Sequence, residues 1–334
     1  MSDLVINKLP GRTFSWLGVN EAVVSDLEGS QGALHYKKEL SEKIKVVQGS
    51  GGDDGGDDGI EIYQIPENCR LEKPIYFWLA YNRSARNQIE IRVHKGSEVT
   101  IVMDHSALQQ EREAEIQGLF STRIKLEEHA KVKCIEIQKA HAGVEFVNEL
   151  RVECLEGAGF EITQLFLGEG RIYQDLHCEL KGYGSKFQAD SAYLIGKQGK
   201  LDINYVVTHY GKKTTSDIKL NGVLREQAEK IFRGTIDFQH GSSGAVGAEK
   251  EDVLLMDPTV SNKTVPLILS REENVSGTHG ATIGRLGKEL LFYLESRGMT
   301  KAEVYEMMAR ARIDALVKRI TDERTRKVIW EDLK

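Results

Sequence analysis

The sequence predicts a mainly β protein: a β-solenoid core followed by a short helical region. Glycine is frequent, with 32 residues, and proline is scarce, with 5 residues, in a chain of 334. Many tight turns without proline fit a β-rich body better than a helical bundle. Strand–turn–strand segments recur every ~25–33 residues through the middle of the chain. After residue 284 the apolar residues change to helical spacing.

Residues 1–59 form the predicted N-terminal region, which ends in an acidic loop. Residues 49–59 read GSGGDDGGDDG, a composition that cannot bury a core and whose acidic groups repel each other. An EF-hand calcium loop needs alternating oxygen ligands and a closing glutamate, which this segment lacks. We therefore expect a flexible surface loop and no calcium site.

Residues 60–284 form the predicted core, in which each copy of the repeat is strand, small-residue turn, strand. In the first copy, Ile89, Ile91 and Val93 alternate with polar residues, and Gly96 marks the turn. One copy cannot bury its apolar face alone, so neighbouring copies must stack. This favours a β-solenoid over a sandwich. The copies are residues 89–104, 122–138, 149–167, 175–195 and 217–238.

Residues 285–334 form the predicted helical region, with two short helices joined by a tight turn. The first is apolar at helical spacing from Leu286 to Leu294, and Gly298 is a typical C-terminal stop. Thr300 and Glu303 have the spacing of a capping box, which marks the second helix. Its expected apolar stripe continues towards Ile320 through Val304, Met308, Ala311 and Ala315.

Charge and composition exclude several classes of protein. The net charge is −6, which argues against a general nucleic-acid binder. Residues 285–334 hold 12 Lys/Arg and 9 Asp/Glu, a local charge of +3, which fits either a partner surface or a solvated helix face. No apolar run is long enough for a membrane span, and no signal peptide is recognisable. No P-loop is present, so we expect no nucleotide bound by this chain.

Two residues stand out as chemical candidates. His279 lies among small residues where the core ends, and imidazole is a good ligand for iron or zinc. Spacing alone favours a structural or surface histidine, with a metal ligand as the alternative. Cys178 lies within an alternating strand, where a buried small hydrophobe is the default and a reactive thiolate the alternative. The four cysteines are far apart and lack a Cys-x-x-Cys pattern, which favours a reduced, cytoplasmic compartment.

Residues 248–299 resemble the C-terminal signature of the SufB/SufD family of iron–sulfur cluster assembly proteins. The resemblance is carried by the Leu254-Leu255 pair, by the segment SGTHGATIG at residues 276–284, and by Phe292-Tyr293-Leu294 followed by Arg297-Gly298. It implies a right-handed parallel β-helix core. It also implies a scaffold rather than an enzyme, working with a SufC-type ABC ATPase that docks on the helical region.

The same resemblance assigns candidate roles. His279 would lie at a subunit interface, where it contacts the metal of a transient iron–sulfur cluster. Glu251 stands near the place where SufB-type chains carry a cysteine, and a glutamate there could ligate iron but departs from the SufB pattern. Cys178, in CELKG, matches a cysteine that receives sulfur. Phe292, Tyr293 and Arg297 would contact the ATPase.

The mixture of SufB-like and SufD-like features leaves the partner open. We expect a homodimer, or a heterodimer with a SufB-type chain, formed by strand pairing near residues 235–275, because an unpaired strand edge needs a cover. Two alternatives remain. In the first alternative, the chain is a structural partner of an ABC ATPase without cluster chemistry. In the second, it is a carbohydrate-active enzyme built on a β-helix.

Overall fold

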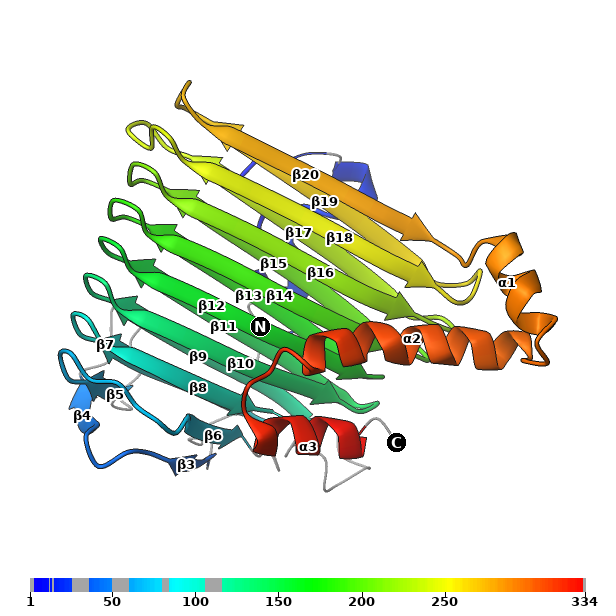
Figure 1. Ribbon diagram of the computed structural model, residues 1–334, viewed down its shortest axis with the longest axis horizontal. Coiled ribbons are helices and arrows are strands. Elements are labelled where there is room, and N and C mark those ends of the chain that lie inside the picture. Colours follow the sequence, from blue (N-terminus) through cyan, green and yellow to red (C-terminus); the bar gives the residue numbers. More distant parts are fainter. Residues whose placement is uncertain are drawn as a thin grey trace.

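The protein is a parallel β-solenoid of about seven turns with three C-terminal helices, seen in a computed structural model (Figure 1). The structure describes residues 3–11, 13, 15–25, 36–49, 60–79, 84–105 and 116–332. The predicted fold class is confirmed. Residues 50–59, for which a flexible acidic loop is predicted, lie outside the described residues.

Within the described residues, two sheets of nine strands face each other across one core. We call the first the helix-covered sheet; its strands are β3 (Tyr36–Glu39), β6 (Ile75–Leu79), β8 (Glu98–Asp104), β10 (Lys131–Ala140), β12 (Gly159–Gly168), β14 (Lys186–Ile195), β16 (Thr215–Leu224), β18 (Val246–Leu255) and β20 (Ser276–Gly284). We call the second the hairpin-covered sheet; its strands are β4 (Lys45–Gly49), β5 (Ile60–Ile65), β7 (Ala85–Val93), β9 (Ile116–Leu126), β11 (Val144–Cys154), β13 (Arg171–Leu180), β15 (Lys200–His209), β17 (Glu229–Phe238) and β19 (Ser261–Ser270).

Each predicted copy contributes one strand to each sheet, so its turn is a corner of the solenoid. Residues 89–104 become β7 and β8, with Gly96 in the turn at a φ of 66°. The left-handed backbone needed there suits glycine. Through the first four copies, strands pair in parallel with the same strand of the next copy, so that Arg123 is opposite Arg151 and Arg151 is opposite His177. The fifth predicted copy is out of phase, because it begins with β16 and leaves β15 outside the predicted copies. Stacking thus covers each copy by its neighbours, as the repeat predicted.

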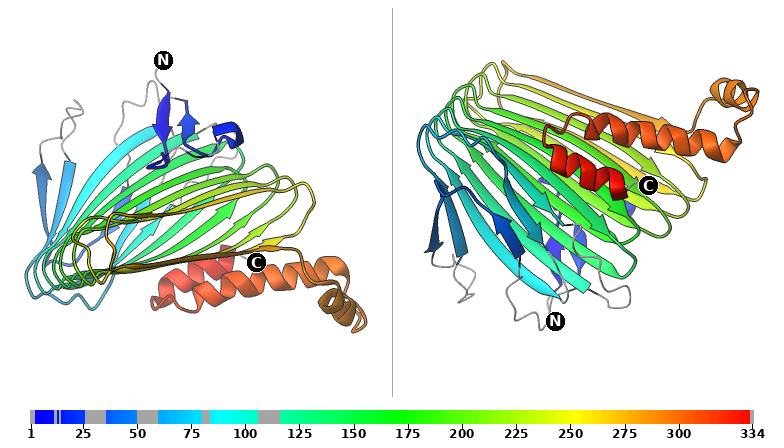
Figure 2. Two further views of the ribbon diagram at one scale, coloured as in Figure 1. Left: turned by 90° about the horizontal axis from the view of Figure 1, so that it is seen from above. Right: turned by 60° about the horizontal axis from the view of Figure 1, so that its bottom comes forward.

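The first described strands, β1 (Leu4–Ile6) and β2 (Ala22–Val24), pair antiparallel and lie on the outer face of the hairpin-covered sheet. A short 3-10 helix, η1 (Ser15–Leu17), lies between them. Figure 2 shows this hairpin and the C-terminal helices on opposite outer faces of the solenoid. The small apolar cluster beneath the hairpin contains Ile6, Ala22, Val24, Leu119, Val147 and Tyr173.

The C-terminal helices are α1 (Lys288–Glu295), α2 (Lys301–Val317) and α3 (Glu323–Asp332). The capping box of Thr300 and Glu303 is present, and Gly298 has the positive φ, 93°, expected of a helix stop. The third helix was not predicted. Helix α2 lies on β14 and β16, and both oxygens of Asp190 accept hydrogen bonds of 2.8 Å from Arg319, just after the helix.

The predicted apolar stripe of α2 is wrong in its second half. Ala311 and Ala315 are exposed, and the helix instead buries Ile313, Leu316 and Val317 against the sheet. These larger side chains remove more apolar surface from water than alanine does. The helix is therefore rotated to place them inward.

Candidate functional site

The solenoid ends in an open cross-section at β19 and β20, at the top of Figure 1. Each is the last strand of its sheet, with a neighbour on one side only among the described residues. The side chains of β19 are mostly half-buried and those of β20 are almost all exposed. A parallel strand edge of this kind presents unpaired backbone groups and part of the core to a partner.

His279 lies on β20 at this open end and is exposed. In the parallel ladder it is directly opposite Glu249 of β18, while Ala281 is opposite Glu251. Paired residues of adjacent strands point to the same face of a sheet. The side chains of His279 and Glu249 therefore extend from adjacent strands on the same face of the sheet, at the open end.

Glu251 is fully buried and forms an ion pair with Lys230, which is also fully buried. Its second oxygen accepts a 2.6 Å hydrogen bond from the Thr264 hydroxyl. Burial lowers the pKa of Lys230, and the charge of Glu251 opposes that shift. The Glu251 carboxylate therefore has its partners within the fold. Lys230 was missed in the sequence because it comes from the opposite sheet, 21 residues away.

Glu249 has a different environment, although it is only two residues from Glu251. Its side chain is 6% exposed. Burial, followed by the nearby Glu251 carboxylate, raises the pKa of Glu249 to about 8. Gly234 of β17 faces it, and a Cβ atom there would lie 1.9 Å from Oε2 of Glu249. The glycine therefore leaves the room that this carboxyl group occupies.

Cys178 lies inside the solenoid on β13 and is fully buried. Burial raises the pKa of its thiol, and a contact with the Cys154 thiol adds to the shift. Strands β15 and β17 separate β13 from β19 in the sheet. The structure thus places Cys178 in the apolar core and not beside His279.

The predicted ATPase-binding residues lie on and next to α1, which buries none of its residues. Phe292 is 75% exposed and Tyr293 is 53% exposed. The guanidinium carbon of Arg297 lies 5.2 Å from the centre of the Tyr293 ring, in a cation–π contact. Exposed aromatic groups at this density are typical of a contact surface.

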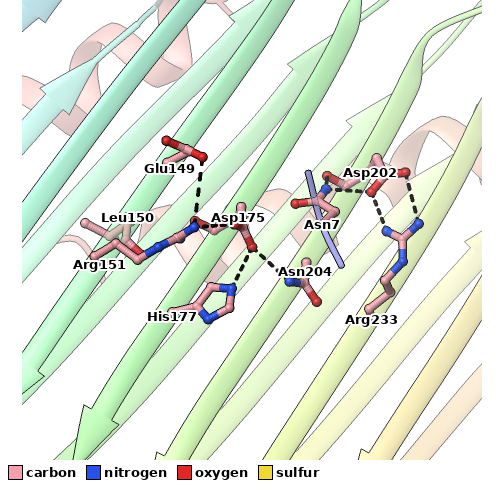
Figure 3. A network of polar contacts seen from close by, with 9 residues as sticks. All are labelled: Asn7, Glu149, Leu150, Arg151, Asp175, His177, Asp202, Asn204 and Arg233. Atoms are coloured by element: carbon pink, nitrogen blue, oxygen red, sulfur yellow. Dashed lines mark hydrogen bonds and ion pairs between the residues drawn. The ribbon is translucent and has the colours of Figure 1, made fainter. Parts of the chain in front are cut away.

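A polar network on the outer face of the hairpin-covered sheet was not predicted (Figure 3). The buried Asp175 accepts hydrogen bonds from Arg151 at 2.6 Å and from Asn204 at 2.8 Å, and His177 lies 3.1 Å away. Burial opposes ionisation, but these partners hold the pKa of Asp175 at about 2. A separate part of the network joins Asn7 and Arg233 to Asp202. Alternation of polar residues on β13 and β15 was its only signal in the sequence.

Within the described part of the chain, no group of three or more His, Cys, Asp or Glu side chains that could hold a metal ion is present. Among the same residues, no helix has the length and apolar character needed to cross a membrane.

The fold and the site define a β-solenoid protein with an open end at β19 and β20 and with helices docked on one outer face. The family model described as "SUF system FeS cluster assembly, SufBD core domain" matches residues 78–312. The chain belongs to this family, as the resemblance predicted.

Curated relatives include members of both branches of the family. The chain is similar to an iron–sulfur cluster assembly SufBD family protein of Staphylococcus saprophyticus, with 26% identity over 270 residues, 79% of this chain and 57% of the relative. It is also similar to two Bacillus subtilis proteins. One is SufB, at 24% identity over 79% of this chain and 57% of the relative. The other is SufD, at 24% identity over 73% and 56%. The chain thus spans a little over half the length of these relatives.

Proposed function

We propose that the chain is a scaffold subunit of a SUF-type iron–sulfur cluster assembly complex. The observation that carries the proposal is the open end of the solenoid, where His279 is exposed on a free strand edge. A transient iron–sulfur cluster is the cargo of this site and is handed on. We assign no reaction to the chain alone and place its work in the cytoplasm.

The free edges of β19 and β20 are the surface that we assign to a second subunit. Their half-buried and exposed side chains contrast with the buried ones of β17 and β18. Pairing with an identical chain or a SufB-type chain would satisfy the edge and cover the open core. This subunit would place a second surface next to His279.

Anaerobic reconstitution with iron and sulfide tests the proposal. Wild-type protein, as a dimer or with its SufB-type partner, should retain iron through gel filtration, and His279→Ala should lose most of it while keeping its fold. Equal iron retention by the variant would remove His279 from the site. Sedimentation of the same samples at micromolar concentration measures their oligomeric state. A monomer in the absence of a partner would exclude the homodimer.

We assign the exposed surface of Phe292, Tyr293 and Arg297 to a SufC-type ABC ATPase. Replacing both Phe292 and Tyr293 with Asp should abolish co-purification with the ATPase, because an interface would then bury unpaired charge. Circular dichroism should be unchanged, since α1 buries no residue in this chain. ATPase binding at wild-type level by the folded double variant would contradict the assignment.

A purely structural partner of an ABC ATPase is the second candidate. The ion pair between Glu251 and Lys230 favours it, because Glu251 is already neutralised where SufB-type chains carry a cysteine. Under this alternative the ATPase would bind as proposed, and the reconstituted protein would retain no iron.

A further inference from the structure

Glu249 is a buried carboxyl group that the fold leaves without a hydrogen-bond partner. It is 6% exposed, and within the described residues it takes part in no hydrogen bond or ion pair. Its carboxyl oxygens are not among the fully enclosed side-chain atoms that lack a partner, so they reach the open end of the solenoid. Glu251, by contrast, has its donors in Lys230 and Thr264. The Glu249 carboxyl group is therefore available to a ligand at the open end.

The register of the open end directs Glu249 to His279. The two residues are direct partners in the ladder between β18 and β20, on strands about 4.8 Å apart. Glu251 has Ala281 as its partner, which offers no donor atom. Gly234 provides the space that keeps the Glu249 carboxyl group in place, since any side chain there would displace it.

We propose that Glu249, and not Glu251, supplies the carboxylate that binds divalent iron together with His279. The inference rests on the proposed function and names a residue that our sequence analysis did not select. Imidazole and carboxylate groups together suit Fe²⁺. One chain supplies only these two donors, consistent with the absence of any group of three in the described residues. Pairing of two open ends, or sulfide, would supply the others.

This is tested by titrating the oxygen-free 334-residue chain with Co²⁺. Binding is measured by the visible absorption that appears when protein donors replace water on the ion. Co²⁺ replaces Fe²⁺ in this experiment because it follows Fe²⁺ directly in the order of affinities of divalent metals for protein ligands. Glu249→Gln and His279→Ala should each weaken Co²⁺ binding by roughly 10- to 100-fold or more. Removing a residue that only hydrogen-bonds to a metal ligand already lowers metal affinity by this factor. Glu273→Gln, an exposed residue between β19 and β20, is the control for charge and should bind as wild type.

A second comparison separates the two glutamates. The double variant Lys230→Met/Glu251→Gln removes the Glu251 carboxylate without leaving Lys230 unpaired. Its affinity for Co²⁺ should be within about threefold of wild type, a smaller change than the loss of a residue that hydrogen-bonds to a metal ligand would cause. Loss of binding in this double variant, with Glu249→Gln unaffected, would overturn the proposal in favour of Glu251. If His279→Ala loses binding and Glu249→Gln does not, Glu249 is not a ligand and the proposed function stands. Wild-type binding by both would refute a metal site at the open end altogether.

Discussion

Lys230→Met is expected to destabilise the last turns of the solenoid more than other single changes in this region. Glu251 would remain fully buried beside Thr264 with no cation. Removing one member of a buried ion pair costs ~3–5 kcal/mol, because the other charge is left uncompensated. Urea denaturation should show this loss, and hydrogen exchange should locate it to β17, β18 and β19, because each turn of a solenoid depends mainly on its neighbours.

The double variant Lys230→Met/Glu251→Gln is the matched control. A neutral amide at residue 251 can still accept the hydrogen bond from Thr264, and replacing both charges of a buried pair is often neutral or stabilising. The double variant should therefore be more stable than Lys230→Met alone. If the single variant is as stable as wild type, the pair does not carry the charges that its geometry indicates.

The fold could be predicted from the sequence because its signal is local and repeated. In the copy at residues 122–138, Ile124 and Leu126 before the turn and Val132 and Cys134 after it already show which residues face inward. All four are buried. The third helix lacks such a signal, since its docking depends on Arg324 stacking on Tyr76 and Trp78, which lie more than two hundred residues earlier in the chain.

The candidate site could be predicted only in part. His279 stood out through its small neighbours. The difference between Glu249 and Glu251 has no local signal, because both residues lie on the same strand and face the same way. Only the opposite sheet, which brings Lys230 to one and Gly234 to the other, distinguishes them. Long-range pairing of this kind depends on the register of the solenoid, which periodicity alone does not fix.

Arg233→Met is expected to release the N-terminal hairpin from the hairpin-covered sheet (Figure 3). Arg233 is fully buried, pairs with Asp202 and donates hydrogen bonds to the carbonyl oxygens of Val19 and Glu21. Without it, the buried Asp202 carboxylate keeps, among the described residues, a single side-chain partner, the 2.6 Å hydrogen bond from Asn7. We expect a loss of ~3–5 kcal/mol in the free energy that holds the hairpin in place, measured as faster hydrogen exchange in β1 and β2.

Arg151→Met is the matched control, because Arg151 bonds a buried carboxylate on the same face of the same sheet. Its side chain is 38% exposed, and Asp175 keeps His177 and Asn204 as partners when it is removed. The loss should therefore be near that of a surface pair, ~0–1 kcal/mol, and hairpin exchange should be unchanged. Adding Asp202→Asn to Arg233→Met should recover part of the protection, because the uncompensated charge is then gone. Equal exchange in Arg233→Met and wild type would mean that the apolar contacts of Ile6, Ala22 and Val24 hold the hairpin without the ion pair.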